Sequence, residues 1–296
     1  MDLALAIQYA FSGITVGSVY AITAIGFNII YNTTGIINFA QGEFLIVGAM
    51  IAIALAGVMP LPLAITLAVL LTTLLGGLLE LVFLRRVRDN SGLLLIVITI
   101  GISILIREAM LHICGYGVRS LPVFTGSEAS SVEILDAHIA PQVFWVLGVN
   151  TVVVIALTLF FRYTLTGRAM RACADNRHAA RLCGINDRRM VTLSFMISAG
   201  IGALAGCVIS PVTHTQYDMG APLAIKGFTV AILAGLGNSL AAIAAGLMLG
   251  LLEVFTVSQL DAVYKEAVSI AVLLLVLSVR PQGIFTRRGA VTLGAK

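Results

Sequence analysis

The sequence predicts an all-α polytopic membrane protein with about nine transmembrane helices, within a range of eight to ten. Of its 296 residues, 59% are hydrophobic and only 11% are charged. A soluble domain carries roughly 25% charged residues, so this chain lacks the polar surface that a water-exposed globule needs. Several apolar runs also approach the length of about 20 residues with which a helix crosses a hydrocarbon core. Because lipid cannot satisfy backbone polar groups, such runs are expected to be helical.

The apolar runs give the order of the expected helices. They cover residues 5–30, 36–57, 61–84, 93–113, 141–161, 191–211, 223–237, 240–259 and 264–279. The stretches 32–49 and 227–246 each place glycines and polar amides inside apolar sequence, which makes the runs 36–57 and 223–237 candidates for broken or re-entrant segments. Irregular backbone at membrane depth is tolerated only where it is buried in protein or lines a cavity. These two runs therefore point to a transport pathway.

Charge distribution predicts the orientation of the chain. Most of the 18 basic residues cluster in three gaps between the runs. The clusters are Arg85, Arg86 and Arg88; the arginines from Arg162 to Arg189; and Arg280, Arg287, Arg288 and Lys296. The positive-inside rule assigns all three to the cytoplasm. Segment 114–140 carries Arg119 against Glu128, Glu133 and Asp136 and is expected outside. Residues 1–296 are thus read as one membrane domain with an external loop 114–140, a cytoplasmic loop 162–190 and a cytoplasmic C-terminus.

The usual enzymatic motifs do not appear in the sequence. There is no GxxxxGK[ST] loop to bind ATP phosphates, no HExxH and no GxSxG. The cysteines and histidines show no metal-ligand spacing, so we expect no cofactor, no metal site and no enzymatic activity. The basic residues lie between the spans, which indicates a role in orientation and gives no reason to expect a nucleic-acid partner. Glu43 and Glu253 are the deeper intramembrane carboxylates, and their isolation argues against a proton relay.

The basic loop predicts one short helix with two faces, from about Arg168 to Cys183. A stripe of small residues comprises Ala172, Asn176, Ala179, Ala180 and Cys183, and the polar face comprises Arg171, Asp175, His178 and Arg181. Gly184 supplies a C-terminal stop. An alanine stripe is too weakly hydrophobic to anchor in lipid but suits a groove in a partner protein. The spacing alone is equally compatible with a loop whose arginines only fix the topology.

Four motifs resemble one family of transport proteins. The string GRAMRACADNRHAARLCGIN (residues 167–186) resembles the cytoplasmic coupling loop of ABC-importer permeases, most closely the LivH-type permeases of branched-chain amino-acid uptake systems. INFAQGEFLIVGA (37–49) resembles an early motif of that group. AGLGNSLAAIAAGLMLGLLE (234–253) and YKEAVSIAVLLLVLSVRPQGIF (264–285) resemble its C-terminal half.

The resemblance implies a type II ABC-importer-like permease bundle in the bacterial plasma (inner) membrane. Such a subunit contains the pathway for branched-chain or other hydrophobic amino acids. Its partners are a second related permease, two cytoplasmic ABC ATPases, a periplasmic or lipid-anchored substrate-binding protein, and membrane lipid. The expected ATPase-coupling residues are Arg168, Arg171, Ala172, Asp175, Arg177, Ala179, Ala180, Arg181 and Gly184. Asn38, Gln41 and Glu43 are expected either to line the pathway or to brace the break beside it.

Two alternatives remain open at this point. A permease of the same family could carry urea, short amides or aromatic acids, since the binding protein does most of the selection. A stand-alone ion-coupled carrier or channel would belong to a different class and would work without any ATPase.

Overall fold

The structure is a computed structural model that describes residues 3–87, 92–126, 130–134, 137–259, 264–280 and 283–285. Six charged residues used above to predict the orientation lie outside the described residues. They are Arg88, Glu128, Asp136, Arg287, Arg288 and Lys296.

Each of the predicted apolar runs forms a helix. The long helices are α1 (Leu3–Thr34), α3 (Leu61–Leu79), α4 (Gly92–Cys114), α5 (Pro141–Tyr163), α8 (Asp187–Thr213) and α10 (Ser239–Gln259). A π-helical stretch, Glu80–Leu84, extends α3. The shorter apolar helices are α2 (Gln41–Ala56), α9 (Gly220–Ala234) and α11 (Tyr264–Val279). The basic loop contains α6 (Leu165–Asp175) and α7 (Arg177–Leu182).

Six helices within the described residues are long and apolar enough to cross a membrane. Helices α2 and α9, with 16 and 15 residues, fall short. At about 1.5 Å per residue they reach roughly 23 Å, against a hydrocarbon core of about 30 Å. The all-α membrane class is therefore confirmed, while the count of nine spans stays a prediction. Helices α2 and α9 overlap the stretches 32–49 and 227–246, in which glycines and amides interrupt the apolar sequence.

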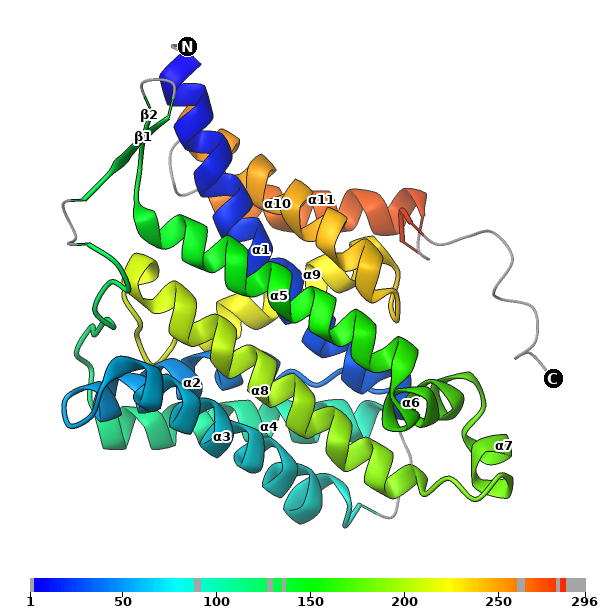
Figure 1. The fold of residues 1–296 in the computed structure, drawn as a ribbon. Coiled ribbons are helices and arrows are strands. Elements are labelled where there is room, and N and C mark those ends of the chain that lie inside the picture. Colours follow the sequence, from blue (N-terminus) through cyan, green and yellow to red (C-terminus); the bar gives the residue numbers. More distant parts are fainter. Residues whose placement is uncertain are drawn as a thin grey trace.

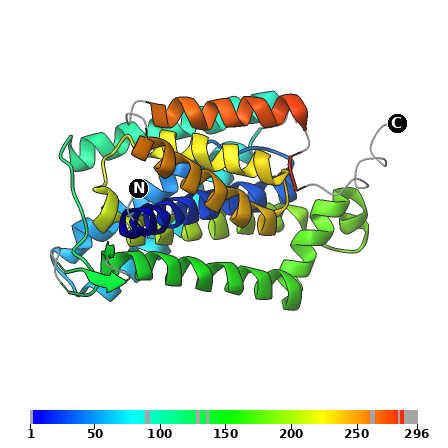
Figure 2. The same ribbon diagram turned by 90° about the horizontal axis from the view of Figure 1, so that it is seen from above.

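The long helices run side by side between two ends of the molecule (Figure 1). One end carries the N-terminus and a small β-hairpin, and we call it the hairpin end. The opposite end, the α6–α7 end, carries those two helices. Seen from above, α1 lies between α5 on one edge and α10 with α11 on the other (Figure 2). Helix α1 is also the most buried of the six long helices, which makes it the central helix of the bundle.

Helices α1 and α10 pack closely where their glycine pairs meet. A β-carbon added at Gly17 would lie 2.6 Å from the carbonyl oxygen of Gly246, and one added at Gly13 would lie 2.9 Å from the α-carbon of Leu251. Neither position has room for a larger side chain without moving the backbone of the partner helix. Small residues four apart allow this approach in a membrane, where dispersion must supply the attraction between helices. Gly13, Gly17, Gly246 and Gly250 are thus packing sites between α1 and α10.

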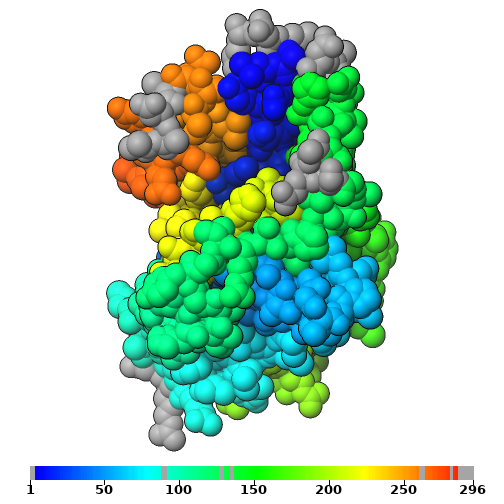
Figure 3. Space-filling model, turned by 90° about the vertical axis from the view of Figure 1, so that its left-hand side faces the viewer, coloured from blue at the N-terminus to red at the C-terminus, as the bar shows by residue number. Residues whose placement is uncertain are grey.

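The segment between α4 and α5 contains a hairpin that the all-α prediction did not include. Strands β1 (Val132–Ile134) and β2 (Ala137–Ile139) pair antiparallel, with Glu133 opposite His138. Leu121 of the same segment is buried, and its amide donates to the hydroxyl of Ser210 on α8. Figure 3 shows this connection, in green, spread across the hairpin end. The connection is thus docked on the bundle and closes part of that end.

Candidate functional site

The basic segment forms two helices, so the prediction of one helix from Arg168 to Cys183 is wrong. Asn176 lies between α6 and α7 in an extended conformation (φ −155°, ψ 101°), and its side chain accepts a hydrogen bond of 2.9 Å from the amide of Ala179. Asparagine is among the best N-cap residues, and its side chain competes with helix continuation by bonding to the backbone. Gly184 ends α7 with φ +82°, which confirms the predicted stop.

Helix α6 is anchored in the bundle by one face. Gly167, Met170 and Cys173 are buried on that face, and Met170 is part of the core around α1 and α9. A β-carbon at Gly167 would collide with the backbone of Phe160. Arg168 and Asp175, on the other face, are exposed, and Ala172 is half-buried. Any displacement of α6 therefore acts directly on the helices that it contacts.

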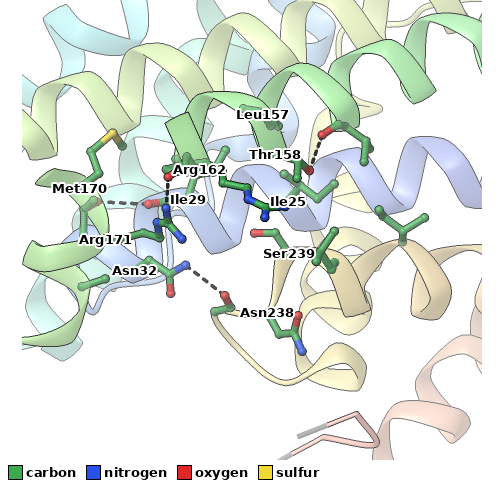
Figure 4. Close-up of a pocket in the computed structure, with 17 residues that line it drawn as sticks. Ile25, Ile29, Asn32, Leu157, Thr158, Arg162, Met170, Arg171, Asn238 and Ser239 are labelled. Carbon is green, nitrogen blue, oxygen red and sulfur yellow. Dashed lines mark hydrogen bonds between the residues drawn. The ribbon is translucent and has the colours of Figure 1, made fainter. Parts of the chain in front are cut away.

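Arg171 takes a different place from the one predicted for it. Its guanidinium donates to the carbonyl of Phe161 at the end of α5, and the side chain turns toward a cavity beside α1 (Figure 4). In the predicted role it would reach outward to an ATPase. In the structure it links α6 to α5.

Helix α7 is held against the start of α8 by one carboxylate. The Nε of Arg177 lies 2.8 Å and the Nη2 of Arg181 lies 2.6 Å from Oδ2 of Asp187, whose side chain is only 9% exposed. The hydrogen bond from Arg181 to Asp187 raises the pKa of the guanidinium. Both arginines keep about half of their side chains exposed, so they can still reach a partner. Asp187 therefore fixes the orientation in which α7 is presented.

In this orientation only part of the small-residue stripe is exposed. Ala180 is 4% exposed and packs within the chain, so it is not available to a partner, contrary to the prediction. Ala179 and Cys183 are exposed, together with Leu182, whose exposed fraction is 79%. Sequence reasoning missed Leu182, although it follows Ala179 by three residues and is an apolar residue in a basic segment. We call Ala179, Leu182 and Cys183 the outer face of α7.

Removing the charge of Asp187 is expected to release α7. In Asp187→Asn, both arginines lose their ionic partner, and the fixed orientation of the outer face is lost. We expect ATP-coupled transport to fall several-fold, because charge-assisted hydrogen bonds are about twice as strong as neutral ones. Uptake per inserted molecule measures the effect. Glu108→Gln, at an exposed position on α4, is the matched control. Wild-type uptake in Asp187→Asn would contradict this role.

The first break, between α1 and α2, contains the three residues predicted for the pathway. Asn38, Gln41 and Glu43 are all buried. The side chain of Asn38 accepts from the amide of Ala40 at 3.2 Å, and so fixes the turn that precedes α2. The Nε2 of Gln41 donates to the carbonyl of Ser198 on α8 at 3.2 Å, and Glu43 accepts from the hydroxyl of Ser103 on α4 at 2.8 Å. The sequence left two roles open for these residues, lining the pathway or bracing the break beside it. These contacts support the bracing role.

Loss of these contacts is expected to affect all substrates equally. In Gln41→Ala the carbonyl of Ser198 loses its donor, at a cost of about 1–3 kcal/mol. Glu43→Gln keeps an oxygen that can accept from Ser103 but makes that bond neutral, hence weaker, and puts a buried amide donor in place of the second oxygen. We expect a lower unfolding temperature and lower uptake, with the ratio of uptake between competing solutes unchanged. Gln8→Ala, at an exposed position in the first turns of α1, is the control. A changed ratio between solutes would show instead that these side chains contact the cargo.

The second break, between α9 and α10, is held by α1. Gly235 and Gly237 adopt positive φ values of +86° and +94°. The side chain of Asn28 accepts from the amide of Gly237 at 3.0 Å, and that of Asn32 donates to the carbonyl of Gly237 at 3.1 Å. Sequence reasoning missed this clamp, although two amides one helical turn apart near the end of an apolar helix were a visible signal. Both breaks are thus fixed by side chains of other helices.

A buried ionic cluster joins four helices. The carboxylate of Glu253 on α10 is fully buried and lies 2.9 Å from the Nζ of Lys226 on α9. Tyr20 of α1 donates to it at 2.8 Å, and Ser269 of α11 also donates. Lys265 of α11 lies 3.6 Å away. Charges inside a bilayer are costly unless they are paired, and here each helix supplies a partner. The sequence singled out Glu253 but not Lys226, whose partners come from distant parts of the chain.

The bundle, its two braced breaks and its docked basic segment define a multi-pass membrane permease. The chain belongs to the family described as branched-chain amino acid transport system / permease component, which matches residues 9–277. This membership confirms the family expected from the four motifs.

The sequence similarity to known relatives extends over almost the whole chain. The chain is 35% identical to the high-affinity branched-chain amino acid transport system permease protein LivH of Salmonella typhimurium, covering 95% of this chain and 96% of the relative. Its identity to the BraD permease protein of Pseudomonas aeruginosa is 32%, with the same coverage. A ribose import permease protein, RbsC of Haemophilus influenzae, is 23% identical over 80% of this chain. The chain is a transport permease subunit.

Proposed function

We propose that the chain forms the translocation pathway of an ATP-driven importer for branched-chain or other hydrophobic amino acids. The observation that carries this proposal is the full-length similarity to permeases named for branched-chain amino acids. The ribose permease has a lower sequence identity and matches a smaller share of the chain, which favours amino acids as the cargo.

The energy for transport comes, in this proposal, from partner subunits. The sequence has no GxxxxGK[ST] loop, and the family is a component of a larger transport system. We assign it a second related permease, two cytoplasmic ATPases and a periplasmic or lipid-anchored binding protein. The α6–α7 end then faces the cytoplasm, with the C-terminus on the same side. Nine crossings follow if α2, α9 and α11 count as spans together with the six long helices.

Coupling passes through the basic segment. Closure of the ATPases pushes on the outer face of α7 and on the exposed arginines, among them Arg168. Because the buried face of α6 packs in the core, the displacement reaches α5, α8 and α1. Helix α1 holds the second break through Asn28 and Asn32. Movement at the ATPase is thereby linked to the irregular backbone where the pathway is expected.

Reconstitution tests the proposal. Proteoliposomes that contain the chain, its partner permease, the two ATPases and the binding protein should accumulate labelled leucine when ATP is supplied inside. Unlabelled isoleucine and valine should compete, whereas urea, acetamide, benzoate and ribose should not. Vesicles with this chain alone should not accumulate leucine, with or without an ion gradient. Uphill uptake by the chain alone would establish the ion-coupled carrier instead.

A further inference from the structure

A cavity of about 460 Å³ opens at the α6–α7 end of the bundle. It lies between α1, α5, α6 and the turn that leads into α10. Figure 4 shows Arg162 of α5 and Arg171 of α6 reaching into it, and Asn32 and Asn238 also line it. The role proposed above for the basic segment does not use this cavity.

The mouth of the cavity is positively charged and rich in donors. Arg162 and Arg171 both line it, and none of its lining residues is an Asp or Glu. Among the described residues, no carboxylate forms an ion pair with either arginine. Arg162 stacks on the ring of Tyr163 at 5.4 Å and is otherwise available. Two unneutralised guanidinium groups at one opening favour a phosphate or carboxylate ligand.

Much of the cavity wall is apolar. Ile25 and Ile29 of α1, Leu157 of α5 and Ile243 of α10 line it. A ligand that satisfies both parts has an anionic head and a hydrocarbon tail. A free amino acid fits less well, because its ammonium group would find no carboxylate there.

We propose that this cavity binds an anionic phospholipid, with the phosphate at Arg162 and Arg171 and an acyl chain along the apolar wall. Basic pockets between transmembrane helices on the cytoplasmic side are suited to such head groups. Arg162 is in the last turn of the apolar helix α5, the depth at which a head group lies. The assignment to the cytoplasmic leaflet rests on the orientation proposed above, whereas the binding itself does not.

A lipid in this position would connect the coupling segment to the bundle. It would contact α6 through Arg171, α5 through Arg162 and α10 through Ile243. The lipid would therefore transmit part of the movement of α6 to α5 and α10.

Native mass spectrometry of the full chain, delipidated and then incubated with defined lipid, tests the site. Wild-type protein should retain phosphatidylglycerol in preference to phosphatidylcholine. Arg162→Gln together with Arg171→Gln should lower that retention by about five-fold per arginine, from the usual contribution of a basic residue near anionic lipid. Arg86→Gln, an exposed arginine outside the cavity, should retain the wild-type preference.

A second variant distinguishes a lipid from a soluble anion. Ile243→Trp fills the apolar part and leaves both arginines, so phosphatidylglycerol retention should fall while the charge is unchanged. Inorganic phosphate at millimolar concentration should not displace the lipid from wild-type protein. The proposal is overturned if the double arginine variant retains lipid as Arg86→Gln does. It is also overturned if phosphate displaces the lipid and Ile243→Trp has no effect. Neither result depends on an ATPase, so both leave the proposed transport function untouched.

Discussion

Ala179→Trp is expected to lower ATP-driven uptake by at least about tenfold while the protein remains folded and inserted. Ala179 is exposed on the outer face of α7, so the added ring meets no neighbour within the chain. Asp187 holds α7 in a fixed orientation, and the ring therefore projects toward whatever docks there. A loss of at least about tenfold corresponds to about 1.4 kcal/mol of docking free energy.

The measurement is leucine uptake per molecule of inserted subunit, together with the amount of ATPase that co-purifies. Val118→Trp, at an exposed position of the connection between α4 and α5, adds the same bulk at the hairpin end and should not change either quantity. Normal uptake in Ala179→Trp would show that α7 is not part of the docking surface.

Glu253→Gln is expected to destabilise the bundle by about 3–5 kcal/mol, the usual cost of removing one partner of a buried ion pair. The substitution keeps the size of the side chain but leaves Lys226 without its carboxylate inside the membrane. Packing between α1, α9, α10 and α11 should loosen, since Tyr20, Lys226 and Ser269 all converge on this carboxylate.

Thermal unfolding in detergent and the yield of folded protein measure this effect. The double variant Lys226→Met with Glu253→Gln should recover part of the loss, because no unpaired charge then remains in the pair. Glu108→Gln, whose carboxylate is exposed, should unfold like the wild type. An unchanged unfolding temperature in Glu253→Gln would show that the cluster does not stabilise the bundle.

The helices themselves could be predicted because in lipid a long apolar run has few alternatives to a helix. Helices α2 and α9 were visible as shortened segments for a different reason: glycines and amides interrupt the apolar sequence at 32–49 and 227–246. The hairpin at Val132–Ile139 was missed, since strands of three residues carry almost no periodic signal.

The site was harder to predict than the fold. The break at Asn176 depends on one capping side chain in a segment whose small and polar residues fit a helix equally well. Lys226 and Asn28 act through partners on other helices, and their separation in sequence hides that proximity. Ala180 was assigned outward because Asp187, which turns α7 onto α8, lies beyond the predicted helix.

Site-specific cross-linking tests most directly whether an ATPase moves the chain through α7. A photoreactive residue at position 179, in membranes that contain all subunits, should form an adduct with the nucleotide-hydrolysing subunit. The same residue at position 118 should not. Adducts absent from 179 in a complex that hydrolyses ATP and transports leucine would contradict the account.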